Sequence, residues 1–154
     1  MDVRAYVEYN GNYRYILSVI DVISKCLNLI HIRTKSGPSV ASAFRSIFDE
    51  RRRRRPIFVS TDKGKEFLNK HFQDMLRDEV IQFQVCRNPD LKCAVVERVY
   101  RTIRDRFCKY FTHKNTYKDI DILPKFVKAY NDTVHSMSSM APSRVTDSDV
   151  LAIW

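Results

Sequence analysis

Two motifs place acidic residues where a folded chain can use them as metal ligands. The first is Ser60-Thr61-Asp62-Lys63-Gly64, in which Asp62 ends a β-branched segment and the glycine permits a tight turn. Ligand sites favour such strand ends in α/β sheets. The second runs from Asn88-Pro89 to Glu97, where a loop leads into the first turn of a helix. Because Mg²⁺ prefers oxygen ligands, carboxylates from these motifs suit a magnesium site.

Metal ions held in this way support chemistry at a phosphodiester. Two Mg²⁺ ions about 3.5–4 Å apart can activate a nucleophile and stabilise the leaving oxygen. Each acid also has an ordinary interpretation, Asp62 as a turn residue and Glu97 as a partner of the helix dipole. Their joint occurrence in this order, with 34 residues between them, favours the catalytic interpretation.

The chain resembles the integrase core of retroviruses and long-terminal-repeat elements over essentially its whole length. Thr61-Asp62-x-Gly64-x-x-Phe67 resembles the motif of the second catalytic aspartate, and the segment 88–97 resembles the loop and helix of the catalytic glutamate. The spacing is one residue shorter than is usual in the family. Further matching positions are Arg101-Thr102, Tyr130-Asn131, His135, Ala141-Pro142 and Val145. The resemblance implies an α/β fold of the ribonuclease-H type, with a mixed five-stranded sheet flanked by helices on both faces.

The first catalytic aspartate has two candidates, Asp2 and Asp21. The family carries this residue on the first strand, upstream of a hairpin, and Asp2 matches that position, whereas Asp21 falls on the second strand. The resemblance therefore implies Asp2, Asp62 and Glu97 as catalytic residues and as ligands of two Mg²⁺ or Mn²⁺ ions. Asp2 would bridge both ions, and the other two acids would hold one each. An ordinary terminal charge is the alternative interpretation of Asp2.

Basic residues accompany the glutamate. Arg101 and Arg104 follow Glu97 at helical spacing, so all three share one helix face, and the resemblance implies that this face contacts DNA. A solvated face with an ion pair is the alternative. Arg87 and Lys92 lie in the loop that faces DNA in the family. Tyr100 departs from the family, which usually has asparagine there.

The net charge of +9 is concentrated in the middle of the chain. Residues 51–110 hold sixteen Lys/Arg against eight Asp/Glu, whereas the segments on either side are nearly balanced. Such a surplus suggests a polyanionic partner, and double-stranded DNA is the one that the resemblance implies. The run Arg51–Arg55 is either a nuclear-import or nucleic-acid patch or a solvated loop. The four cysteines form no Cys-x-x-Cys pair, so we expect reduced thiols.

The elements that must position these residues can be predicted from periodicity. We expect strands at 2–9, 13–21, 26–33, 57–60 and 81–85, and helices that begin near 37, at 65–79, at 94–111 and at 119–134. Val96, Val99, Ile103, Phe107 and Tyr110 are expected to face the core, and Pro89 is expected to block regular structure. We expect a core domain at 1–146 and a C-terminal tail at 147–154.

The function that follows is metal-dependent DNA 3′-end processing and strand transfer. The alternative is a catalytically degenerate, element-derived DNA-binding or interaction domain. A ribonuclease H ranks last, because Asp49 and Glu50 are poorly placed for its additional carboxylate. We expect a nuclear protein with no membrane segment, and the resemblance suggests a homodimer. We expect the chain to hold the core alone, without the zinc-binding and C-terminal domains that are usual in the family. Only Met1 precedes Asp2, so we expect weak activity from residues 1–154 alone.

Overall fold

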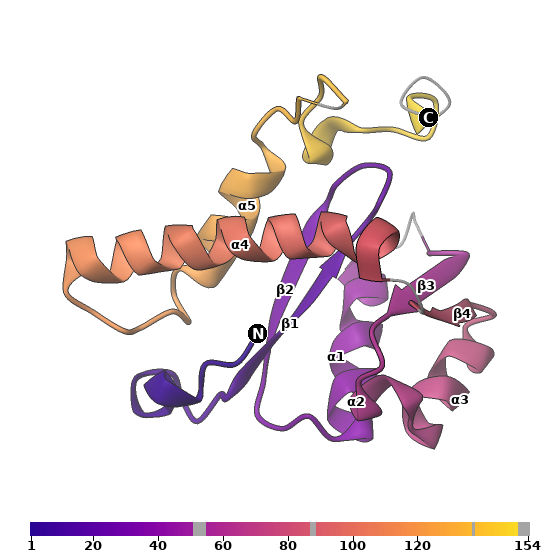
Figure 1. Ribbon diagram of the computed structural model, residues 1–154, viewed down its shortest axis with the longest axis horizontal. Coiled ribbons are helices and arrows are strands. Elements are labelled where there is room, and N and C mark those ends of the chain that lie inside the picture. The colour runs from indigo at the N-terminus through magenta and orange to yellow at the C-terminus, as the bar shows by residue number, and fades with distance from the viewer. Residues whose placement is uncertain (51–54, 87–88, 137, 151–154) are drawn as a thin grey trace.

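The computed structural model describes residues 1–50, 55–86, 89–136 and 138–150, and its strands lie in two small sheets (Figure 1). Strands β1 (Tyr15–Ile20) and β2 (Leu27–Ile32) pair antiparallel, and β3 (Phe58–Thr61) and β4 (Gln82–Val85) pair parallel. These four strands were predicted to within about two residues at each end. They do not join into one sheet within the described residues, where the predicted five-stranded sheet is seen as two pairs.

The predicted first strand at 2–9 is wrong. Only Asp2 forms a β-bridge, with Tyr15, and a 3-10 helix covers Arg4–Tyr9. Local hydrogen bonds explain this turn of the chain: Tyr6 N donates to Val3 O, and the Asn10 amide donates to Tyr6 O. Each satisfies a backbone group that a strand would have offered to a neighbour.

Three of the helices were expected from the sequence: α1 (Gly37–Glu50), α4 (Pro89–Lys114) and α5 (Leu123–Asn131). The single helix predicted at 65–79 is instead two helices, α2 (Lys65–Leu68) and α3 (Lys70–Asp78). The break falls at Asn69, whose Oδ1 accepts from Phe72 N at 3.1 Å and so caps α3. Pro89 does not block structure. It is the first residue of α4, where a missing N–H leaves no helical bond unmade.

The β1–β2 sheet is covered by helices on both faces. Leu17 packs with residues of α1 and α3, whereas its neighbour Ile16 packs with residues of α4 and α5. Successive strand residues point to opposite faces, so this alternation places one cluster on each side. Figure 1 shows α4 crossing in front of β1–β2, with α5 and α1 on opposite sides of the hairpin.

Two expectations about burial are wrong. Val96 is 43% exposed, although it was expected to face the core with Val99 and Ile103. Ile57 and Phe58 are 80% and 44% exposed, although the strand beginning there was expected to be buried. The segment at β3 is exposed because, in the described part of the chain, β3 has a neighbouring strand on one side alone. Of the helices in that part, none is both long and apolar enough to cross a membrane.

Candidate active site

Asp62 lies at the carboxyl end of β3, as the sequence predicts. Its side chain is exposed, and Oδ1 accepts a hydrogen bond from Gly64 N at 3.0 Å. A Cβ on Gly64 would lie 2.9 Å from Asp62 Oδ1 and 2.8 Å from Glu66 Oε2, so it would displace one of these carboxylates. The turn at Gly64 thus gathers the carboxylates of Asp62 and Glu66 at one strand end.

Asp2 is held beside β1. Ile16 N donates to Met1 O and Val3 N donates to Arg14 O, which fix the backbone on either side of Asp2. Its carboxylate accepts from Arg4 Nε at 2.9 and 3.1 Å and forms an ion pair with Arg4 Nη2 at 2.8 Å. Hydrogen bonds from the Arg4 guanidinium, and then from the Arg4 backbone, hold the pKa of Asp2 below its usual value. The Asp2 carboxylate is thus ionised and paired with the Arg4 guanidinium of the same chain.

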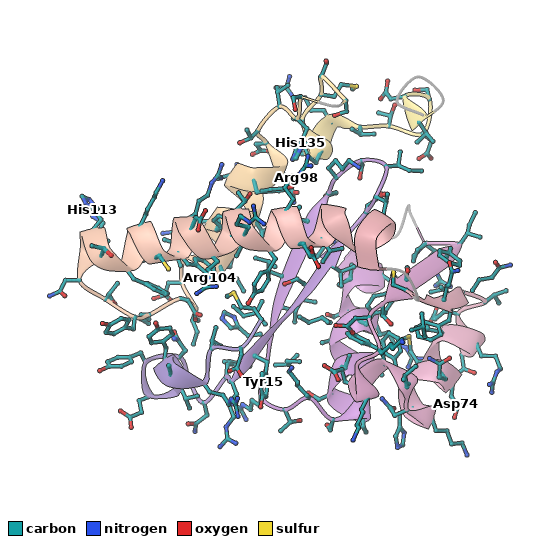
Figure 2. The ribbon with its side chains drawn as sticks, in the orientation of Figure 1. Tyr15, Asp74, Arg98, Arg104, His113 and His135 are labelled. Atoms are coloured by element: carbon teal, nitrogen blue, oxygen red, sulfur yellow. The ribbon has the colours of Figure 1, made fainter. Side chains whose placement is uncertain are left out.

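Glu97 lies on the exposed side of α4. Val99 and Ile103 of the same helix are buried against the β1–β2 sheet, whereas Glu97, Arg101 and Arg104 are exposed. Arg104 extends from α4 in Figure 2. A carboxylate followed by two guanidinium groups on an open helix face can approach a phosphate backbone. Arg87 lies outside the described residues, as does the side chain of Lys92.

The charges around Met1 indicate which acids lie near one another. Burial lowers the pKa of the Met1 amino group and Lys35 lowers it further, while Asp2, Glu66 and Asp62 act in the opposite direction. These three carboxylates therefore lie within electrostatic range of the Met1 amino group. No three His, Cys, Asp or Glu side chains of the described residues are grouped as a metal site. The convergence of Asp2, Asp62 and Glu97 on metal stays a prediction.

Asp21, the rival of Asp2, has a local task. Its Oδ1 accepts from Ile23 N at 2.9 Å and from Ser24 N at 3.4 Å, which closes the turn between β1 and β2. This is the behaviour of a turn aspartate.

Two charged residues near Asp62 were missed by sequence reasoning. Lys35 Nζ lies 3.7 Å from Glu66 Oε1, and the ammonium also sits 5.1 Å from the centre of the Tyr15 ring. Glu66 could have been noticed, because it follows Asp62 at a distance of four residues across a glycine. Lys35 gave no such signal, since its nearness to the site depends on the packing of α1 against the α2–α3 joint.

Comparison with known protein families identifies the family of the chain. Residues 1–90, more than half of the chain, match the profile of the integrase core domain. The chain belongs to the integrase core domain family. A putative uncharacterized transposon-derived protein of Caenorhabditis elegans is 31% identical to this integrase core over 144 residues, which are 94% of the chain. The chain spans 50% of the length of that relative.

Solved structures share the fold of this integrase core. The magnesium-bound catalytic core of HTLV-2 integrase, in a trimeric form, is 19% identical over 86% of the chain and 85% of its own, with a TM-score of 0.72. The simian T-cell lymphotropic virus intasome in complex with the PP2A subunit B56 gamma gives 0.76 at 18% identity, over 88% of this chain and 49% of the matched one. The BIV integrase core gives 0.67 at 18% identity, over 83% and 82%. The chain therefore has the ribonuclease-H-like α/β fold of integrase catalytic cores.

Proposed function

We propose that this integrase core is a metal-dependent polynucleotidyl transferase that trims the 3′ ends of DNA and joins them to a second DNA. The observation that carries the proposal is the turn at Asp62. The exposed carboxylate of Asp62 stands at the end of β3 and accepts a hydrogen bond from Gly64 N, in a chain of the integrase core family.

The residues present fit divalent magnesium or manganese. Asp2, Asp62 and Glu97 offer oxygen atoms alone, and each is exposed, as an ion that keeps several of its waters requires. We assign these three residues as ligands of two ions. When bound, such ions would activate the attacking oxygen and stabilise the leaving oxygen at the phosphodiester. Asp2 must first exchange its Arg4 partner for metal.

The rest of the proposal concerns DNA and assembly. Arg101 and Arg104 would bind phosphates of double-stranded DNA, because they share an exposed face of α4 with Glu97. A strand through residues 1–3 would lie between β1 and β3 and complete a five-stranded sheet. Two observations support this: Met1 O accepts a hydrogen bond from Ile16 N of β1, and the charge of Asp62 opposes the lowering, by burial, of the pKa of the Met1 amino group. We also propose a homodimer, as one matched HTLV-2 core is described in dimeric form, and a nuclear location.

A second candidate function is an element-derived DNA-binding domain without catalysis. It is favoured by the Arg4–Asp2 contact, which occupies one of the proposed ligands, and by the exposed Tyr100, which lies one turn from Glu97. In that case Arg101 and Arg104 would still bind DNA, and added metal would have no effect on the protein.

Thermal melts with and without millimolar Mn²⁺ separate these two functions. Metal should raise the melting temperature of the chain, since a ligand that binds the folded state alone stabilises it. Asp62→Asn and Glu97→Gln should abolish the rise, and Asp21→Asn is the matched control that should keep it. Strand transfer from pre-cleaved DNA ends in Mn²⁺ then tests catalysis. A folded protein that does not respond to metal would contradict the enzyme and favour the binding domain.

A further inference from the structure

Lys35 and Glu66 bring a loop and a helix together beside Asp62. Lys35 lies between β2 and α1, and Glu66 lies in the first turn of α2. Their charged atoms are 3.7 Å apart, with the Glu66 side chain 21% exposed and that of Lys35 50% exposed. The pair is therefore more enclosed on its acidic side than a solvated surface ion pair.

The approach of these two segments is fixed by packing. A Cβ on Gly37 would lie 2.0 Å from Asn69 Oδ1, so the start of α1 rests directly on the Asn69 carboxamide. That carboxamide also donates to Glu66 O and accepts from Phe72 N. Because Gly37 is two residues from Lys35 and Asn69 is three from Glu66, the same contact sets Lys35 opposite Glu66.

Lys35 is also the basic side chain between the acids of the site. Glu66 uses Oε1 for Lys35, while its Oε2 and Asp62 Oδ1 both border Gly64. On the other side, the Lys35 ammonium lies 5.1 Å from the centre of the Tyr15 ring, and the backbone of Tyr15 forms a β-bridge with Asp2. The ammonium thus contacts Glu66 and the ring of the residue that pairs with Asp2, close to carboxylates whose like charges repel.

We propose that Lys35 and Glu66 are positioning residues of the metal site. Glu66 adds negative charge beside Asp62 and favours a cation there, and Lys35 offsets the repulsion among the carboxylates until a cation binds. This inference rests on the proposed function, because it assumes that Asp62 is a metal ligand. It concerns a pair that holds and tunes the ligands, and neither residue needs to touch the metal.

Opposite effects of the two partners distinguish this role from an ordinary ion pair. Removing the positive charge of Lys35 should strengthen metal binding, and removing the negative charge of Glu66 should weaken it. A dication and a single charge separated by about 8 Å of water interact strongly enough to change a binding constant about fivefold. In an ordinary ion pair, loss of either partner lowers stability slightly and leaves metal binding unchanged.

The experiment measures Mn²⁺ affinity by calorimetry and the metal-free melting temperature for the chain and four variants. We expect Lys35→Met to bind Mn²⁺ about fivefold more tightly and to melt lower without metal, because the carboxylates lose their counter-ion. Glu66→Gln should bind about fivefold more weakly and melt no lower than the parent, and Lys35→Arg should behave as the parent. Lys65→Met is the matched charge control, since it removes an exposed lysine next to Glu66 and should change the affinity less than Lys35→Met does.

The outcomes separate the two proposals. If the parent binds Mn²⁺ and both Lys35→Met and Glu66→Gln shift affinity in the same direction, or neither does, the positioning pair is refuted and the metal site stands. The same holds if Lys65→Met matches Lys35→Met, since the effect would then be one of net charge. If the folded parent binds no Mn²⁺, the metal site of the proposed function fails and this inference fails with it.

Discussion

Replacing Asn131 by alanine should be among the most destabilising polar substitutions in the chain. The Asn131 carboxamide forms two buried hydrogen bonds with one residue of β2, accepting from Leu27 N at 2.8 Å and donating to Leu27 O at 2.9 Å. The side-chain amide uses one N–H donor and its oxygen acceptor here, so it pairs with the strand as a neighbouring peptide group would. It thereby anchors the end of α5 to the edge of β2.

The cost follows from what the substitution leaves behind. Leu27 is 0% exposed, so water cannot replace the lost partner at either backbone group. Each net hydrogen bond contributes about 1 kcal/mol, and a buried group left without a partner costs about 1–3 kcal/mol. We therefore expect Asn131→Ala to lower the free energy of unfolding by about 3 kcal/mol. This is a large part of the roughly 5–15 kcal/mol typical of a domain.

Urea denaturation followed by circular dichroism measures this loss. Asn28→Ala is the matched control, because Asn28 stands on the same strand and is half-buried, and its substitution should cost less than about 1 kcal/mol. Asn131→Asp should also be destabilising, since a carboxylate can accept from Leu27 N but cannot donate to Leu27 O. A loss below about 1 kcal/mol for Asn131→Ala, at an unchanged denaturant slope, would refute the assignment of a strand-like anchor.

Three further predictions concern other parts of the molecule. His31→Phe should lower the free energy of unfolding by about 3 kcal/mol in the same assay, because it leaves the Asp119 carboxylate, 1% exposed, without the partner that lies 3.0 Å away; a neutral result would contradict this. Burial, and then Lys25, lowers the pKa of His135, so the folded state favours the neutral ring. Stability should therefore be retained above pH 6.5 and lost as pH falls below it, and melts of His135→Gln should show a flatter decline. Arg101→Ala combined with Arg104→Ala should weaken binding to all DNA sequences and reduce the slope of log K against log salt by about 0.9 for each lost phosphate contact, whereas an unchanged slope would assign both arginines to a solvated face.

The strands and the long helices could be predicted because their signals are local. The β-branched runs at β1 and β2 and the stripe of Val99, Ile103 and Phe107 on α4 repeat with the period of the element that they form. Asp62 could be placed for the same reason, since a β-branched run followed by Asp-Lys-Gly ends a strand at a turn. The placement of Asp62 depends on residues adjacent to it in the sequence, so it could be predicted from them directly.

Features that depend on partners distant in sequence could not be predicted. Asn69 interrupts a helix that its flanking residues favour, because its side chain caps α3 and supports Gly37. Val96 lies on the apolar side of α4 by periodicity and lines a pocket with Val19 and Ile20 of β1, yet it is 43% exposed. Lys35 pairs with Glu66, about 30 residues away, and Asn131 pairs with Leu27, 104 residues away. The sequence around Lys35 or Asn131 contains no pattern that predicts these contacts.

The division of the apolar interior into two clusters bears on how the catalytic acids are held. Asp62 follows β3, whose Val59 packs on the cluster of α1 and α3, whereas Glu97 is two residues from Val99 in the cluster of α4 and α5. The hairpin β1–β2 supplies residues to both clusters, so the two acids are held on opposite faces of one shared hairpin. Substitutions that loosen the packing on either face should therefore disturb the separation of Asp62 and Glu97, and amide hydrogen exchange in the hairpin would report such loosening.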